Sequence, residues 1–483
     1  MAESERFVFH SHFPCSVEEL YSWHARQGAL ERLIPPWENT TVLRKKGGLD
    51  PGGEVEMRMH AGGVPFSWVA HHVENQPGTM FRDIQYKGPF ASWSHTHIFT
   101  SLHDGADGAD GADGADDPDG RDSAGLEDRI EYALPLHSWL PAAIKNHVRR
   151  TLQRTFEHRR RVLEADLRLH AECSQKHMRV LISGASGVLG RALKPLLTTG
   201  GHEVFSLVRR VPDRNNNELY WNPETGEIDT LPVVDAVIHL AGEYIGLGRW
   251  SAEKKKRVVE SRTRGTGLLA ETIASQPDPP KVFLCASAIG FYGDTEAAEV
   301  DESADAGNGF ISKVCARWEN AAAPAQRAGI RTVFMRIGIA LSPNGGALKR
   351  LLAASPFLLR RFGSGRQYIS WISLDDTISA IYHAMCCTTL EGPVNMAAPN
   401  PVTNATFLHN LSKITGRPLA FPVPAKLLKA IYGQMAAEIL LSGCRTDCRK
   451  LQESGFVFRH EHLEDALMDM LGKFSLTDVT GKR

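Results

Sequence analysis

The first third of the chain alternates apolar and polar residues over short segments that are separated by turn residues, a pattern typical of β-strands. A helical SVEELYSWHA follows the first segment, and a long helical stretch from about Leu140 to His170 closes the region. The pattern therefore predicts a sheet followed by one long helix. The predicted strands read FVFHSHF, TTVLRKKGG, EVEMRMHAG, FSWVAHHVEN, MFRDIQYKG, SHTHIFTSL and RIEYALPL.

From Met178 onward, apolar strands alternate with amphipathic helices. A strand from Arg179 to Ile182, a glycine-rich turn, a helix from about Val188 to Thr198 and a second strand from Glu203 to Val208 open this region. Further strands and helices follow in alternation up to about residue 400. This order predicts an α/β fold with a doubly wound parallel sheet.

An abrupt change of composition interrupts the first region between Asp104 and Gly125, where the triplet Asp-Gly-Ala repeats. Glycine and aspartate are poor formers of helices and strands, and so acidic a segment cannot bury enough apolar area to offset its ordering entropy. We expect a disordered surface insertion over 104–125. A calcium site is the weaker interpretation, because the repeat lacks the spaced bidentate glutamate of an EF-hand.

The charge balance excludes a general affinity for nucleic acid or anionic membranes, because 55 Lys and Arg residues face 56 Asp and Glu residues. No apolar run reaches 18 residues, and Met1 to His12 lacks the apolar core of a signal peptide. The eight cysteines form no Cys-x-x-Cys pair. We therefore expect a cytoplasmic protein with reduced thiols.

The first region is rich in histidine, and strand alternation would place His95 and His97 on one face of the sheet. That arrangement suits a metal ion. No carboxylate or cysteine in a recognised motif accompanies the pair, so a polar strand face is the favoured interpretation and no metal site is predicted.

The glycine-rich turn predicts a dinucleotide site. Gly184, Gly187 and Gly190 follow a strand and open a helix, so that the backbone can turn tightly and approach a pyrophosphate at the helix N-terminus. At the end of the second strand stand Val208 and Arg209, where an acidic residue would select NAD(H). A guanidinium can bind a 2′-phosphate, so NADP(H) is the predicted cofactor, although Arg209 could be a solvent-facing charge. The turn residues assigned to the cofactor are Gly184, Ala185, Ser186, Gly187, Val188, Leu189 and Gly190.

The order of elements in the first region resembles the helix-grip fold of the START/polyketide-cyclase-like (SRPBCC) superfamily, as do WHARQGALERLIPPWE and YKGPFASWSHTHIF. The resemblance implies an α+β domain whose apolar cavity holds a small lipid or aromatic ligand. A further hypothesis is that this cavity delivers a hydrophobic substrate to the second half of the chain.

The second half resembles the extended short-chain dehydrogenase/reductases, and within them the epimerase family proteins of the YfcH type. The segments that carry this resemblance include HLAGEYI, ESRTRGT, ASAIGFYGD, RIGIALSPNGGAL and GSGRQYISWISLDD. It implies a Rossmann domain with a small C-terminal cap. It also implies cofactor contacts at the Leu240, Ala241 and Gly242 turn and at Arg262, Arg336 and Gly338, although the last three could equally form structural ion pairs or turns.

Members of that superfamily use a serine with a Tyr-x-x-x-Lys pair, in which the tyrosine exchanges a proton with the substrate while hydride moves to or from nicotinamide. Ser287 fits the serine position and Tyr292 follows it, but no tyrosine in the chain has a lysine four residues later. Phe310 and Val314 stand where the pair is expected. Either Tyr292 or a nearby Glu302 or Glu319 acts as the acid/base, or the protein binds NADP(H) without catalysis.

Three domains are therefore expected: a helix-grip domain over 1–172, an NADP-binding Rossmann domain over 178–400 and a cap over 401–475. The expected activity is that of an oxidoreductase or a sugar-nucleotide-type epimerase, with Ser287 and Tyr292 as candidate catalytic residues. A non-catalytic NADP(H)-binding sensor or interaction protein is the alternative. The expected partner is a small-molecule substrate or a hydrophobic ligand, with neither nucleic acid nor membrane.

Overall fold

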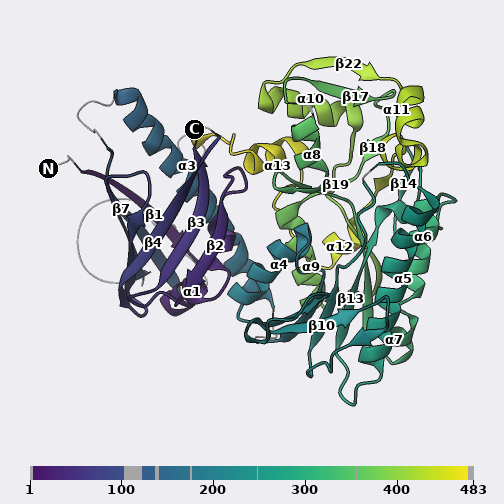
Figure 1. Cartoon of the computed structure of the whole chain (residues 1–483), viewed down its shortest axis with the longest axis horizontal. Coiled ribbons are helices and arrows are strands. Elements are labelled where there is room, and N and C mark those ends of the chain that lie inside the picture. The colour runs from purple at the N-terminus through teal and green to yellow at the C-terminus, as the bar shows by residue number, and fades with distance from the viewer. Residues whose placement is uncertain are drawn as a thin grey trace. The chain divides into compact units, whose positions relative to one another are not determined.

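The computed structural model describes residues 4–61, 63–102, 122–135, 141–173, 177–246, 248–354 and 356–476. The chain forms two compact units, residues 1–171 with 475–483 and residues 172–474 (Figure 1). Residues 103–121, most of the predicted acidic insertion, lie outside the described residues. Its predicted end at Gly125 is too late, because a strand begins at Ser123 and pairs with Leu102 of the preceding strand.

The first unit is a seven-stranded antiparallel sheet in the order β1-β7-β6-β5-β4-β3-β2. Alternation in β1 buries Phe7, Phe9 and Phe13, and the long helix α3 packs Phe156 and Leu163 against the same side. The predicted α+β helix-grip fold is confirmed. The elements are β1 (Glu5–Phe13), α1 (Val17–Ala25), α2 (Ala29–Leu33), β2 (Thr41–Lys46), β3 (Glu54–Ala61), β4 (Val64–Gln76), β5 (Met80–Lys87), β6 (Ser92–Leu102), β7 (Ser123–Ala133) and α3 (Ala142–Glu172).

A small cavity lies between the sheet and α3, and it differs from the lipid-sized apolar space that the resemblance implied. Its volume is about 20 Å³, which is room for about one water molecule. Polar side chains, among them His24, His97, Asp128 and Arg159, share its lining with Phe13, Phe156 and Leu163. Burial lowers the pKa of His24 to about 4, so its imidazole is neutral. At about 20 Å³ this cavity is too small for a hydrophobic substrate, and a larger ligand space in this unit stays a prediction.

The second unit is built on an eight-stranded sheet in the order β11-β10-β9-β8-β12-β13-β15-β20, parallel except for the edge strand β11. Helices α5, α6 and α7 lie together on one side, whereas α4 packs with α9 on the other (Figure 1). The predicted doubly wound Rossmann fold is confirmed. The elements are β8 (Arg179–Ser183), α4 (Val188–Thr199), β9 (Glu203–Val208), β10 (Glu218–Asn222), β11 (Glu227–Ile228), β12 (Ala236–His239), α5 (Ala252–Ala274), β13 (Val282–Ala288), η3 (Ile289–Phe291), α6 (Phe310–Asn320), α7 (Ala323–Arg327), β15 (Arg331–Ile337), α9 (Leu374–Cys386) and β20 (Gly392–Met396).

A smaller group of elements covers the carboxyl end of this sheet. Two-stranded pairs tie segments before and after residue 400 together, as in β17 with β22 and β18 with β21. A core around Trp371, Phe407 and Leu467 holds them. The remaining elements of the second unit are η2 (Arg214–Asn216), between β9 and β10, and β14 (Glu299–Val300), β16 (Ile339–Ser342), α8 (Gly346–Ala354), β17 (Leu359–Phe362), β18 (Tyr368–Ile369), β19 (Trp371–Ser373), β21 (Val402–Thr403), α10 (Asn404–Thr415), β22 (Leu419–Val423), α11 (Ala425–Tyr432), the π-helix η4 (Ala436–Leu440), β23 (Arg445–Thr446), α12 (Arg449–Glu453) and α13 (Leu463–Met470).

The expectation that every cysteine is a reduced thiol differs from the structure. Cys173 and Cys386 form a disulfide within the second unit, with their Cα atoms 5.5 Å apart. The bond joins the segment before β8 to the end of α9. The pairing spans 213 residues, so no short-range cysteine motif could reveal it.

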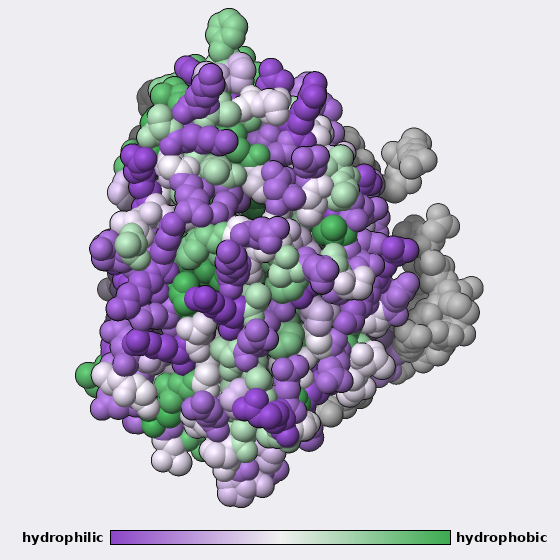
Figure 2. Space-filling view, turned by 90° about the vertical axis from the view of Figure 1, so that its right-hand side faces the viewer, coloured by the Kyte–Doolittle hydropathy of each residue, from purple (hydrophilic) through white to green (hydrophobic). Residues whose placement is uncertain are grey.

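The surface of the molecule is mixed in polarity. Figure 2 shows one face on which charged and polar side chains predominate and apolar groups are scattered. Among the described residues, no helix combines the length and apolar character needed to cross a membrane.

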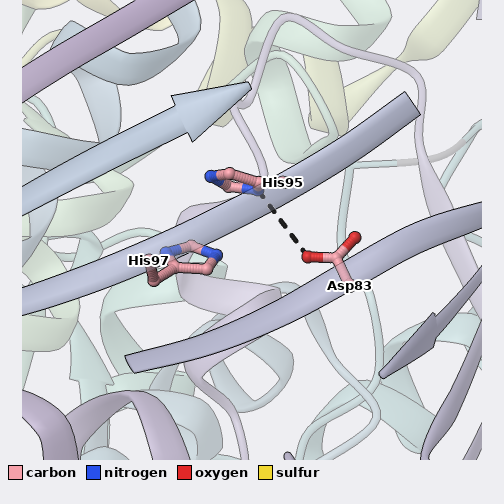
Figure 3. A group of neighbouring side chains, drawn as sticks. All are labelled: Asp83, His95 and His97. Atoms are coloured by element: carbon pink, nitrogen blue, oxygen red, sulfur yellow. Dashed lines mark ion pairs between the residues drawn. The ribbon is translucent and has the colours of Figure 1, made fainter. Parts of the chain in front are cut away.

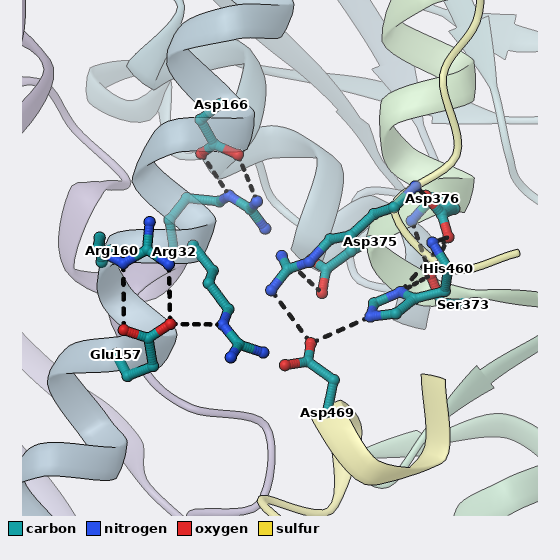
Figure 4. Close-up of polar contacts among 11 residues, drawn as sticks. Arg32, Glu157, Arg160, Asp166, Ser373, Asp375, Asp376, His460 and Asp469 are labelled. Carbon is teal, nitrogen blue, oxygen red and sulfur yellow. Dashed lines mark hydrogen bonds and ion pairs between the residues drawn. The ribbon is translucent and has the colours of Figure 1, made fainter. Parts of the chain in front are cut away.

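A buried charge cluster fastens helix α13 to α9 in the second unit (Figure 4). His460 lies 3.5 Å from Asp376 and 3.3 Å from Asp469, and its side chain is 5% exposed. Burial alone would lower the pKa of His460, but hydrogen bonds to both carboxylates raise it to about 9. His460 is therefore a charged histidine at neutral pH.

Because the pKa of His460 in the folded protein lies above its unfolded value, its stabilising effect is complete below about pH 6.5 and is lost as the pH rises through about 9. We expect the free energy of unfolding lost in His460→Gln to be about 3 kcal/mol larger at about pH 6 than at about pH 10. Urea denaturation over this pH range measures the difference. The exposed neighbour His462→Gln is the control, and a loss that is independent of pH would contradict the assignment.

Candidate functional site

The predicted cofactor residues gather at one edge of the eight-stranded sheet. Strand β8 lies between β9 and β12, and all three are parallel, so their carboxyl ends meet. The glycine turn follows β8, Arg209 follows β9 and the Leu240–Gly242 turn follows β12. The strand order also reverses here, and ligands of open α/β sheets bind at such a point.

Two of the three glycines are required by close backbone contacts. Gly184 has a φ of +76°, and a Cβ there would lie 2.8 Å from the backbone nitrogen of Ala241. A Cβ on Gly190 would lie 2.4 Å from the carbonyl oxygen of Gly184 and 2.6 Å from Cα of Ala185. No side chain fits at either position without moving the backbone. Gly184 therefore allows the glycine turn to pack against the turn after β12, and Gly190 allows helix α4 to pack against the glycine turn.

Gly187 has a different environment, because it is the N-cap of α4 and has no side chain with which to cap it. A Cβ there would meet only the carbonyl oxygen of Gly184, at 3.2 Å. The backbone N–H groups at the start of α4 therefore stand open beside the turn, where a pyrophosphate could accept hydrogen bonds from them.

Arg262 of α5 contacts the turn after β12. Its guanidinium donates to the carbonyl oxygens of Glu243 at 3.0 Å and Val258 at 3.3 Å, and it stacks on the ring of Trp318 at 4.7 Å. A Cβ on Gly242 would lie 3.4 Å from this guanidinium. In this geometry Arg262 positions the turn, which is the structural role that the sequence left open as an alternative. A direct contact between Arg262 and the cofactor stays a prediction.

The two arginines after β9 have different surroundings. Arg210 donates to the Glu218 carboxylate at 2.6 Å and to the carbonyl oxygen of Val211. Arg209 is exposed and makes no side-chain hydrogen bond or ion pair with any described residue. Its guanidinium is thus available at the end of β9, next to Val208, as the sequence predicted for a 2′-phosphate contact.

The candidate catalytic residues lie further along the same edge, in a buried polar network. Register places Ser287 of β13, Arg336 of β15 and Asn395 of β20 side by side. The Ser287 hydroxyl donates to Oε1 of Glu319 at 2.6 Å, and Arg336 donates to both oxygens of the same carboxylate at 3.0 Å. Ser287 and Arg336 are almost fully buried, so both hold Glu319 in the described structure.

Tyr292 belongs to the same network. Its hydroxyl donates to Oδ1 of Asn395 at 2.7 Å and accepts from Arg336 at 2.9 Å. Burial raises the pKa of Tyr292 to about 12, so the phenol is neutral over the physiological range. Burial also raises the pKa of Glu302, whose carboxylate accepts from the backbone nitrogen of Asn395 at 2.7 Å.

Gly338, also assigned to the cofactor, follows β15. A Cβ there would lie 2.7 Å from the carbonyl oxygen of Ser370. The close packing of two backbone segments accounts for the glycine, and contact with a cofactor stays a prediction.

Helix α6 has an apolar residue at each position expected for the tyrosine and the lysine. Phe310 packs against Trp250 with ring centroids 5.3 Å apart, and Val314 is buried. Lys313, the nearest lysine, is exposed. The backbone nitrogen of Phe310 donates to Glu438 of η4, so that carboxylate caps a helix whose N-cap is glycine.

The sequence did not reveal two residues of this region, Asn395 and Glu438. Each lies about 100 residues or more from its hydrogen-bond partner, 103 for Asn395 with Tyr292 and 128 for Glu438 with Phe310. No local motif marks either residue, and only the tertiary structure brings them into contact.

Comparison with known proteins identifies the parts of the chain. The NAD dependent epimerase/dehydratase family matches residues 180–393, and a domain of unknown function (DUF1731) matches residues 423–470. The polyketide cyclase / dehydrase and lipid transport family matches residues 13–160. The epimerase family protein Mb2239 of Mycobacterium bovis is 42% identical over 291 residues, which are 60% of this chain and 96% of that protein. The chain belongs to the epimerase family.

Two solved structures of epimerase proteins are similar to it. The nucleoside-diphosphate sugar epimerase from Corynebacterium glutamicum is 30% identical with a TM-score of 0.75, and the match covers 98% of this chain and 91% of that one. Human epimerase family protein SDR39U1, solved with NADPH, is 31% identical with a TM-score of 0.57, and the match covers 62% of this chain and 100% of that one. Both resemblances inferred from the sequence, to the epimerase family and to the polyketide-cyclase-like superfamily, are confirmed.

The glycine turn gives a prediction that separates folding from binding. Gly190→Ala places a Cβ against backbone atoms, so we expect it to destabilise the second unit by about 1–3 kcal/mol. Gly187→Ala meets a single backbone oxygen at 3.2 Å, so it should cost less than Gly190→Ala, about 1 kcal/mol, yet weaken dinucleotide binding at least about tenfold. Thermal denaturation and nucleotide titration of both variants measure the two effects. Equal stability of the two variants would refute the assigned roles.

Proposed function

We propose that this epimerase family protein binds NADP(H) at the carboxyl edge of β8, β9 and β12, as an oxidoreductase or epimerase-like protein. The observation that carries the proposal is the free guanidinium of Arg209 at the end of β9, beside a glycine turn that fits a pyrophosphate. A carboxylate at that position would repel a 2′-phosphate, whereas a guanidinium can bind it with two hydrogen bonds.

A relative supports the choice of nucleotide. The human protein SDR39U1, which is 31% identical in the structural match, was solved with NADPH. The fold, the glycine turn and Arg209 are the features of this chain that favour the same cofactor.

Arg209 and Arg210 provide a matched pair for testing the proposal. We expect Arg209→Ala to weaken NADPH binding by about 10- to 100-fold, because a charged hydrogen-bonding partner of the 2′-phosphate is lost. NADH binding should change by less than about twofold, since NADH lacks that phosphate. Arg210→Ala, which removes a side chain already bound to Glu218, should leave both affinities nearly unchanged. Titrations that follow nicotinamide fluorescence measure all of them.

Failure of wild-type protein to bind either nucleotide would refute the proposal. Equal loss of NADPH binding in the two arginine variants would instead assign the effect to general charge, because each variant removes one positive charge from the same loop.

Catalysis requires a proton donor in addition to the hydride chemistry that a bound nicotinamide supplies. Of the three acid candidates, Glu319 is held by Ser287 and Arg336, whereas burial raises the pKa of Tyr292 to about 12 and keeps its phenol protonated. Burial also raises the pKa of Glu302. Tyr292 follows the strand that carries Ser287, as expected for an acid beside the nicotinamide. We therefore propose Tyr292 as the proton donor for a substrate carbonyl oxygen.

The second candidate function is NADP(H) binding without catalysis, as in a sensor or interaction protein. The observations that favour it are the apolar Phe310 and Val314 on α6 and the engagement of the Tyr292 hydroxyl by Asn395 and Arg336. A tyrosine that serves as an acid/base in this superfamily is normally activated by a lysine, and no described lysine donates to Tyr292.

Tyr292→Phe distinguishes the two candidates. If Tyr292 donates the proton, kcat for NADPH-dependent reduction of a carbonyl or sugar-nucleotide substrate should fall at least about 100-fold. NADPH affinity should stay within about threefold, since the substitution removes one hydroxyl outside the nucleotide turn. Turnover is measured against a panel of carbonyl compounds and sugar nucleotides. Tight NADPH binding by the wild type with no turnover of any compound would favour the non-catalytic function.

A further inference from the structure

Neighbouring strands of the first unit place several metal-ligating side chains on one side of the sheet. Cross-strand register pairs His72 of β4 with Asp83 of β5, and Asp83 with His95 of β6. His97 follows two residues after His95 and therefore lies on the same side, opposite Asp128 of β7. Ligands drawn from three or four hydrogen-bonded strands are held by the sheet itself, so their spacing does not depend on a flexible loop.

Three of these side chains face a common point. Asp83, His95 and His97 each offer one ligand atom, and the three atoms lie within 4.8 Å of one another. Nδ1 of His95 is 3.7 Å from Oδ2 of Asp83. Figure 3 shows the two imidazole rings on one strand and the Asp83 carboxylate turned toward them from the neighbouring strand.

Asp128 occupies the position of a carboxylate that orients metal-binding imidazoles. Its Oδ1 lies 3.0 Å from Nε2 of His95 and 2.8 Å from Nδ1 of His97. Histidine ligands of metals usually donate their second ring N–H to such a carboxylate, which fixes the ring and its tautomer. One oxygen of Asp128 therefore lies against both rings, so that Nδ1 of His95 and Nε2 of His97 are the nitrogens left for a metal ion.

The charges of the cluster favour a cation. Asp83 and Asp128 bring two carboxylates to the cluster, and Arg159 and Arg160 of α3 line the adjoining cavity. Arg160 is paired with Glu157 and Glu164, so Arg159 is the positive charge that faces the two carboxylates. Two negative charges against one positive charge leave an excess that a divalent cation would neutralise.

Size and access also fit a transition metal. Ligand atoms about 2.0–2.1 Å from a tetrahedral zinc lie about 3.3 Å apart, so the distances between the three ligand atoms need to shorten by at most about 1.5 Å. The cavity between the sheet and α3 reaches His97 and Asp128 and has room for about one water molecule. Two histidines and one carboxylate form a ligand set used for zinc and for non-haem iron(II).

We propose that Asp83, His95 and His97 bind a divalent transition-metal ion of the zinc and iron(II) class in the helix-grip unit, with Asp128 as the positioning residue for both imidazoles. This proposal departs from the polar strand face without metal that the sequence favoured. The sequence could not have shown this site, because Asp83 lies on another strand and belongs to no motif with the histidines.

Titration of the full chain, stripped of metal with a chelator and free of affinity tags, with ZnCl₂ and separately with CoCl₂ tests the proposal. Calorimetry should give one zinc ion per chain. Asp83→Asn and His97→Gln should each weaken binding at least about 100-fold, and Asp128→Asn should weaken it about 10- to 100-fold. The cobalt protein should show d–d absorption without thiolate charge-transfer bands, which separates this site from the cysteines.

His71→Gln is the matched control, because His71 is the neighbour of His72 on β4 but pairs with Glu54 and stacks on Tyr86. We expect its zinc affinity to equal that of the wild type. Circular dichroism verifies folding, and Asp83→Asn, which is nearly isosteric, decides the outcome if a histidine variant unfolds. Zinc binding that survives in Asp83→Asn, or a wild-type chain that binds no zinc at tenfold molar excess, would overturn the proposal.

Discussion

The close approach of two backbone segments, at the carboxyl ends of β8 and β12, is the constraint on which the candidate cofactor site depends. A Cβ on Gly184 would lie 2.8 Å from the backbone of the turn after β12, so only glycine allows this approach. A Cβ on Gly190 would likewise collide with the backbone of the glycine turn, against which α4 packs. Because both contacts are made by backbone atoms, no movement of side chains could remove the clash that a larger residue would cause. The opened N-terminus of α4 and the position of Arg209 follow from this packing.

Beyond the glycine turn, the same edge of the sheet is organised by one buried carboxylate. Glu319 accepts from Ser287 and from two nitrogens of Arg336, and Arg336 in turn donates to Tyr292. Burial of a carboxylate is tolerated only when such partners surround it. The network fixes the ends of β13 and β15, and it includes Tyr292, whose phenol stays neutral because burial raises its pKa to about 12.

Buried charged and polar groups also need partners in the first unit. Its sheet and α3 enclose a polar cluster of histidines and aspartates beside a cavity of about 20 Å³. Buried polar groups require partners. Asp128 lies against both His95 and His97, and the ligand atoms of Asp83, His95 and His97 lie within 4.8 Å of one another, which is the basis for the proposed metal ion.

The sequence by itself determined both folds, the order of their elements, the glycine turn and the absence of a Tyr-x-x-x-Lys pair, because these features rest on local periodicity and short motifs. Contacts between distant residues were decided only by the tertiary structure. The Cys173–Cys386 disulfide, the bond from Asn395 to Tyr292 and the meeting of Asp83 with His95 and His97 belong to this class. Such contacts depend on which segments become neighbours and, for strands, in what register they pair. The residue pattern of one strand does not show which strand will lie beside it.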